Sequence, residues 1–147
     1  MTTTEPVDQV ADCTFCRIIS GFEPADLVLD DAEVVGFLDT RPLFPGHVLL
    51  VPRSHVEVLG ELGDAEVTSL FRAVRDVSVA VEEALGAHGS FVANNNRVSQ
   101  SVPHLHVHVV PRRRKDGLRG FFWPRSRYES AVESAQYAAR LRDALDR

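Results

Sequence analysis

The sequence has no apolar stretch near the length of about 18 residues that a membrane-spanning helix needs. Its first residues also lack the positively charged and apolar segments of a secretory signal. We therefore expect a cytoplasmic protein that does not bind membranes.

Cysteine and basic residues are also scarce. Two cysteines three positions apart do not form the disulfide framework of a small secreted domain. The 16 Lys and Arg residues are outnumbered by 21 Asp and Glu residues, and the net charge of −5 argues against a nucleic-acid partner. Any nucleotide ligand is therefore expected to be small.

The length of 147 residues suits one domain that buries its own core. Residues 1–12 are polar and show no hydrophobic period. We therefore expect a flexible leader over residues 1–12 and a single domain over residues 13–147.

The most informative stretch is His104-Leu105-His106-Val107-His108-Val109-Val110. Alternate side chains of a strand point to opposite faces, so a strand here would place three imidazoles on one face and the apolar side chains on the other. Imidazole is polar and titrates near neutral pH, so three on one face indicate metal or proton chemistry.

The flanking residues extend this pattern. Gln100-Ser101-Val102-Pro103 precedes the run, Pro111-Arg112 follows it, and Pro45-Gly46-His47-Val48-Leu49-Leu50-Val51-Pro52 forms a second block. Together these blocks resemble the histidine triad family of nucleotide hydrolases and transferases, whose motif is His-φ-His-φ-His-φ-φ with φ apolar. The resemblance implies a homodimer.

The resemblance also implies an activity. Family members cleave purine nucleotide phosphoramidates or dinucleoside polyphosphates, with adenosine favoured, at the α-phosphate through a covalent nucleotidyl-histidine, and they release AMP or GMP without a catalytic cofactor. By the same resemblance His106 is the nucleophile, His108 holds a non-bridging oxygen and Ser101 donates a hydrogen bond near the leaving group. His104 either orients His106 or binds zinc.

Two other interpretations remain open. The chain could be a nucleotide-binding regulatory module whose hydrolysis is incidental. Alternatively, His-x-His-x-His could be the centre of a metal-dependent oxygenase or hydrolase, because imidazoles suit zinc and iron.

The pair Cys13-Thr14-Phe15-Cys16 has three interpretations: a redox pair, half of a zinc site, or two ordinary thiols. A redox pair usually accompanies a βαβ pattern, which is missing here. In some bacterial histidine triad proteins such a pair joins a histidine after Pro-Lys/Arg-x-His and the first triad histidine. The resemblance thus implies a structural zinc on Cys13, Cys16, His55 and His104.

Further residues are assigned to substrate binding by the resemblance. Phe15, Ile18 and Phe37 would contact the base, although the first two could be plain hydrophobic anchors. Asp39 would bind the ribose or cap a turn. His47 would support the triad, Asn94 would orient a phosphate or the nucleophile, and Gln100 belongs to the same block. Ser99 replaces the glycine usual before Gln-Ser.

The periodicity predicts the elements of the fold. Strands are expected over residues 26–30, 33–39, 48–51, 90–94 and 104–110, with helices over 15–20, 64–85 and 128–145. Asp64 is the expected N-cap of the long helix. The fold class is therefore α+β, an antiparallel sheet of about five strands with one long helix and a C-terminal helix.

Two segments after the triad have no settled role. The basic run Arg112-Arg113-Arg114-Lys115 is either a solvated loop or a contact for outer phosphates. Phe121-Phe122-Trp123-Pro124 is apolar, and we expect it to pack at a subunit interface or a pocket edge.

Overall fold

The computed structural model describes residues 11–119 and 125–146. The expected leader, apart from Ala11 and Asp12, and the apolar segment at residues 121–124 lie outside the described residues. The chain divides into two compact units, residues 1–116 and 117–147. One domain over residues 13–147 stays a prediction.

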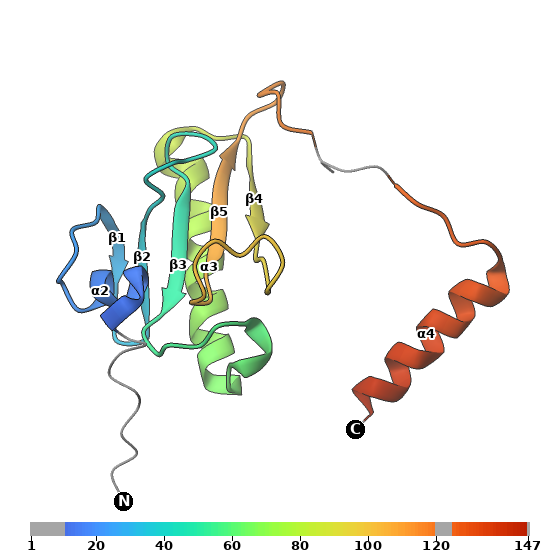
Figure 1. Cartoon of the computed structure of the whole chain (residues 1–147). Coiled ribbons are helices and arrows are strands. Elements are labelled where there is room, and N and C mark those ends of the chain that lie inside the picture. The colour runs from blue at the N-terminus through green and yellow to red at the C-terminus, as the bar shows by residue number, and fades with distance from the viewer. Residues whose placement is uncertain (1–10, 120–124, 147) are drawn as a thin grey trace, which may run out of the picture. The chain divides into compact units, whose positions relative to one another are not determined.

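The first unit is built on a five-stranded antiparallel sheet (Figure 1). Its strands in spatial order are β1 (Leu27–Asp30), β2 (Val34–Leu38), β3 (Val48–Pro52), β5 (Val107–Arg112) and β4 (Gly89–Ala93). This confirms the α+β class and the predicted number of strands. The triad strand is shorter than predicted, because β5 begins only at Val107 and His104 to His106 precede it.

The long helix α3 (Asp64–Leu85) covers one face of the sheet. Its buried positions recur at helical spacing and pack with apolar residues from the strands and with Leu105. The main core consists of Val34, Val48, Leu50, Leu70, Ala73, Val74, Val77, Val81, Leu105, Val107 and Val109. The predicted N-cap was wrong: Gly63 is the N-cap, Asp64 is the first helical residue, and the Glu66 side chain accepts from the Gly63 N–H.

The short helix α2 (Thr14–Ile19) lies over the opposite face, near β1 and β2 (Figure 1). Cys13 is its N-cap, and the Cys13 sulfur accepts from the Cys16 N–H at 3.4 Å. A second core joins the helix to alternate residues of β2 and β3, and it consists of Cys13, Phe15, Cys16, Val35, Phe37, Leu49 and Val51. Period-two alternation therefore gives the sheet two apolar faces.

The sheet register carries this second face across to the triad. Phe37 on β2 pairs with Leu49 on β3, and Leu49 pairs with His108 on β5. Directly paired residues of antiparallel strands point to the same face. The base-contact candidate Phe37 and the triad residue His108 therefore share one face of the sheet, two strands apart.

The remaining elements lie outside the sheet. A single 3₁₀ turn, η1 (Leu59–Glu61), precedes α3. The second unit holds α4 (Ala131–Leu145), which starts at the N-cap Ser130, whose hydroxyl accepts from the Glu133 N–H, and confirms the predicted C-terminal helix. None of the helices in the described ranges is long and apolar enough to cross a membrane.

Candidate active site and cysteine–histidine cluster

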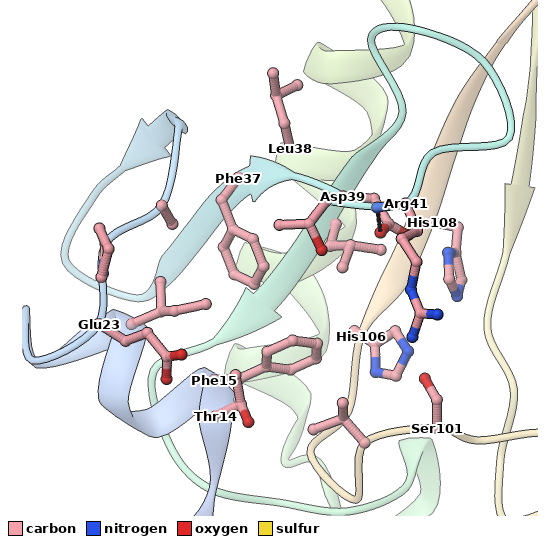
Figure 2. A pocket seen from close by; sticks show the side chains of 16 residues that line it. Thr14, Phe15, Glu23, Phe37, Leu38, Asp39, Arg41, Ser101, His106 and His108 are labelled. Carbon is pink, nitrogen blue, oxygen red and sulfur yellow. Dashed lines mark hydrogen bonds between the residues drawn. The ribbon is translucent and has the colours of Figure 1, made fainter.

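A pocket of about 560 Å³ opens on the face of the sheet that α2 covers (Figure 2). The apolar lining includes Phe15, Ile18, Pro24, Ala25, Phe37 and Leu49, and Figure 2 shows the Phe15 and Phe37 rings together at one end. The other end carries Asp39, Arg41, Ser101, His106 and His108. The structure thus brings Phe15, Ile18, Phe37, Asp39, Ser101, His106 and His108, seven of the predicted site residues, into one pocket.

The orientation of His106 is set by the backbone of its own segment. Its Nδ1 lies 2.8 Å from the carbonyl oxygen of His104, and a carbonyl can only accept, so Nδ1 carries the hydrogen. The lone pair of the neutral ring is then on Nε2. The ring is buried, with Phe15 packed edge-on at 5.2 Å between centroids. This arrangement leaves Nε2 as a nitrogen with nucleophilic character in the pocket.

His47 and His108 form a directed chain of hydrogen bonds. The Leu43 N–H donates to His47 Nδ1 at 3.1 Å, so the hydrogen of neutral His47 is on Nε2. His47 Nε2 then donates to His108 Nδ1 at 2.9 Å. The hydrogen of neutral His108 is consequently on Nε2, the nitrogen that remains for a ligand. His47 is buried and does not line the pocket, so it reaches the pocket through its hydrogen bond to His108.

Both histidines of this chain are held neutral. Burial, with His106 and His47 nearby, lowers the pKa of His108 to about 4, and Asp39 opposes the shift. Burial also lowers the pKa of His47, again against the pull of Asp39. At neutral pH the uncharged pair therefore presents the His108 Nε2–H to the pocket as a hydrogen-bond donor.

The four predicted metal ligands converge beside the pocket. Cys13 Sγ, Cys16 Sγ, His55 Nδ1 and His104 Nδ1 all lie within 4.8 Å of one another. The His104 nitrogen is 3.5 Å from each sulfur and 3.2 Å from the His55 nitrogen. A tetrahedral zinc with its usual bond lengths spaces such ligand atoms by about 3.3–3.8 Å, so the donors and their spacing fit zinc.

His104 is oriented for this cluster. Its Nε2 donates to the carbonyl of Pro52 at 2.9 Å, so the lone pair lies on Nδ1, toward the sulfurs. Burial lowers the pKa of His104 to about 4, which keeps the ligand nitrogen unprotonated. The two predicted roles of His104 are thus divided within the residue, because its side chain belongs to the cluster and its backbone oxygen orients His106.

The three triad imidazoles do not converge on one point. Among the described residues, possible metal ligands group as Cys13, Cys16, His55 and His104, and separately as Asp39, His47 and His108. His106 belongs to neither group. A single ion held by all three triad histidines is therefore inconsistent with the geometry, which weighs against the His-x-His-x-His metal centre.

Asp39 caps a turn, as one of its two predicted roles required, and ribose binding stays a prediction. Its Oδ1 accepts from the Arg41 N–H at 2.9 Å, which closes a turn at the end of β2. Its Oδ2 lies 3.8 Å from His47 Nε2, and the side chain is 23% exposed in the pocket. Turn capping therefore leaves one carboxylate oxygen available for a ligand.

Asn94 and Gln100 are placed outside the pocket lining. Asn94 Nδ2 donates to the His106 carbonyl at 3.0 Å, so it braces the backbone of the central histidine. Gln100 donates to the Glu57 carbonyl and accepts from the Arg97 N–H, so both ends of its amide hold the loop before the triad. Direct contact of these two residues with substrate stays a prediction.

Sequence reasoning missed two charged residues of the pocket, Glu23 and Arg41. Glu23 pairs with Arg17 at 3.0 Å, at the end near α2. Arg41 follows Asp39 by two residues at the end of a strand, and that proximity was the only signal in the sequence that could have revealed it. Figure 2 shows Arg41 extending toward His106, His108 and Ser101.

The basic run after the triad does not line the pocket. Arg112 forms a two-point ion pair with Asp116, and Arg113 donates to the carbonyls of Leu85 and Gly86 at the end of α3. Cationic groups at a helix C-terminus complement its dipole. These contacts favour the loop interpretation over a contact with outer phosphates.

Comparisons with known proteins agree with this geometry. The HIT domain family matches residues 21–115. A *Bacillus subtilis* HIT-family crystal structure superposes with a TM-score of 0.82 at 30% identity, covering 90% of this chain and 96% of that chain. A zinc-bound histidine triad protein from *Mycobacterium smegmatis* gives 0.71 at 34% identity, covering 92% and 99%.

Among curated relatives, the adenosine 5'-monophosphoramidase hnt1 of *Schizosaccharomyces pombe* is 31% identical over 114 residues, 76% of this chain and 83% of the relative. The motif, the sheet that carries it and the extent of these matches lead to one conclusion. The chain belongs to the HIT, or histidine triad, family.

Proposed function

We propose that this protein hydrolyses purine nucleotides at the α-phosphate, acting on nucleotide phosphoramidates or dinucleoside polyphosphates and releasing AMP or GMP. The observation that carries the proposal is the tautomer of His106, whose Nδ1 is bound to a carbonyl while Nε2 faces a pocket with an apolar end. The relative named as an adenosine 5'-monophosphoramidase supports adenosine as the base.

In the first step, the lone pair of His106 Nε2 attacks the α-phosphorus. A nitrogen–phosphorus bond forms, and the bond from phosphorus to the leaving group breaks with its electron pair on the leaving group. An amine leaving group also takes up a proton from solvent, which the second step returns. His108 Nε2–H and the Ser101 hydroxyl lie in the same pocket and can donate to the phosphoryl and leaving-group oxygens, where charge develops.

In the second step, water attacks the nucleotidyl-histidine. The new oxygen–phosphorus bond replaces the bond to His106, nucleoside monophosphate departs, and the water releases its proton to solvent. The sum is hydrolysis with His106 regenerated. The base would pack against Phe15 and Phe37, whose rings contact each other edge-on at 5.2 Å between centroids, and Asp39 would accept from the ribose hydroxyls.

Zinc would be structural in this scheme. Cys13, Cys16, His55 and His104 would hold it, and it would tie the start of α2 to the segment that carries the triad. We also propose a homodimer and a cytoplasmic location. Sedimentation velocity of the full chain should give twice the monomer mass, and a monomer at micromolar concentration would contradict the dimer.

The test of the activity is intact-protein mass spectrometry after brief mixing with adenosine phosphoramidate or diadenosine tetraphosphate. Wild type should show a transient adduct of one adenylyl group and release AMP. His106→Ala should lose the adduct and at least about 10³-fold in turnover, because no other group supplies the nucleophile. His88→Ala is the matched control, since His88 is exposed and does not line the pocket.

Full turnover in His106→Ala would contradict the covalent mechanism. Tight nucleotide binding with no adduct and no AMP from either substrate would instead support the regulatory binding module. That alternative keeps the same pocket and differs only in chemistry.

A further inference from the structure

Arg41 is a cation at the reacting end of the pocket. Among the described residues it is the one arginine or lysine that lines this pocket, whose other charged lining residues are Glu23 and Asp39. The neighbouring His108 is neutral at pH 7, because its pKa is lowered to about 4. Arg41 therefore supplies positive charge beside the reacting end.

The Arg41 guanidinium is available to a ligand. Within residues 11–119 and 125–146, its side chain makes neither a hydrogen bond nor an ion pair. Its backbone is fixed all the same, because its N–H donates to Asp39 Oδ1. A guanidinium offers five N–H donors in a planar fork that matches two phosphate oxygens. The loop thus presents a free anion-binding group from a fixed position.

The position of Arg41 relative to the other lining residues suggests which phosphate it meets. Phe15 and Phe37 lie at the apolar end, and His106 and His108 already supply the attacking nitrogen and a donor for the α-phosphate. Figure 2 shows the Arg41 side chain on the side of the histidines that also carries Ser101, away from the Phe37 ring. The region past the α-phosphate is where a leaving group must lie.

We propose, on the basis of the function proposed above, that Arg41 binds the phosphates of the leaving group. The preferred substrates are then nucleotides linked at the α-phosphate to further phosphates, such as dinucleoside polyphosphates, over those linked to an amine. When the phosphorus–oxygen bond breaks, its electron pair goes to the departing phosphate, and the guanidinium stabilises that charge. A neutral amine gives Arg41 nothing to bind.

The test compares two substrates with the same adenylyl group. kcat/KM is measured for diadenosine tetraphosphate and adenosine phosphoramidate with wild type, Arg41→Ala and Arg41→Lys. Arg41→Ala should lower the ratio of the two values about tenfold or more, the effect of one charge-assisted contact. Arg41→Lys should restore part of it, because lysine keeps the charge and loses the fork.

Arg75→Ala is the matched control. Arg75 is an exposed arginine on α3 that pairs with Asp76 and does not line the pocket, so its loss makes the same change in net charge without the contact. Both rates should stay at the wild-type value in this variant. A fall of the ratio in Arg75→Ala would attribute the effect to net charge and overturn the proposal.

A second measurement does not depend on turnover. In the His106→Ala background, calorimetry should show that Arg41→Ala weakens adenosine tetraphosphate about tenfold and AMP less than about threefold. Equal losses for both ligands, or equal losses of kcat/KM for both substrates, would overturn the proposal and assign Arg41 to the α-phosphate. A tetraphosphate-specific loss of affinity, together with no turnover of either substrate by the wild type, would support Arg41 as a phosphate-binding residue and defeat the hydrolase function.

Discussion

Replacing His55 by alanine removes one of the four candidate zinc ligands and leaves the pocket lining intact. The cluster connects three segments that are distant in sequence: the start of α2 with Cys13 and Cys16, the loop after β3 with His55, and the segment before β5 with His104. A bound ion would therefore hold the triad segment against α2. We expect His55→Ala to affect the stability of the fold more than the catalytic rate.

The magnitude follows from mass action. A ligand that binds only the folded state at about 100 times its dissociation constant stabilises it by about 2.7 kcal/mol. For a chain of this size, 1 kcal/mol corresponds to roughly 4 °C in Tm. Losing the metal should therefore lower Tm by about 10 °C.

The assay is metal content by mass spectrometry together with thermal unfolding, with and without a strong chelator. Wild type should carry one zinc per chain and lose about 10 °C with chelator, whereas His55→Ala should bind less zinc and respond little. His88→Ala should behave like wild type, because His88 is exposed and outside the cluster. The reasoning would be refuted if wild type contained no zinc and its Tm changed neither with chelator nor with added zinc.

Two further predictions concern the fold and its dependence on pH. Gly46→Ala should lower the free energy of unfolding in urea by about 2–3 kcal/mol, because φ is +95° and a Cβ would lie 2.5 Å from Leu85 Cδ1. Gly60 has open space around it, so Gly60→Ala should cost under about 1 kcal/mol. Equal losses in the two variants would contradict the argument. Stability should fall as pH drops from about 6.5 toward 4, because the unfolded chain protonates His108 while burial keeps the folded pKa near 4. The free energy of unfolding is measured at pH 7 and pH 4.5 with chelator present. Its decrease between the two should be about 2 kcal/mol smaller in His108→Gln than in wild type. An identical decrease in both proteins would show that His108 does not contribute to the pH dependence.

The local sequence pattern was enough to predict the helices and strands and much of the site. The alternation from His104 to Val110 places Leu105, Val107 and Val109 under α3 and the histidines on the other face, as predicted, even though β5 begins only at Val107. A period of two persists through extended backbone outside a hydrogen-bonded ladder, so the pattern predicted the faces better than the strand boundary. The cysteine pair and its two distant histidines were found through the family resemblance, and the structure places their ligand atoms together.

Other features could not be read locally. The N-cap of α3 fell on Gly63 and not on Asp64, because the Glu66 side chain reaches back to the Gly63 N–H. Arg41 gave no periodic signal, since a loop side chain is directed by the turn that Asp39 closes. Composition left the basic run open between a solvated loop and a phosphate contact, and only the structure showed Arg113 donating to the carbonyls at the end of α3.

The sequence by itself determined the family, the two apolar periods and the types of side chain that carry the chemistry, because those depend on neighbours along the chain. Only the tertiary structure decided which nitrogen of each histidine is free. His106 is directed by a carbonyl of its own segment, His104 by Pro52 on β3, and His108 by His47, which directly precedes the neighbouring strand β3. The partners of His104 and His108 come from segments distant in the sequence, so local sequence could not reveal them. The nitrogens left free agree with the proposed division of the three histidines among attack, metal binding and phosphate contact.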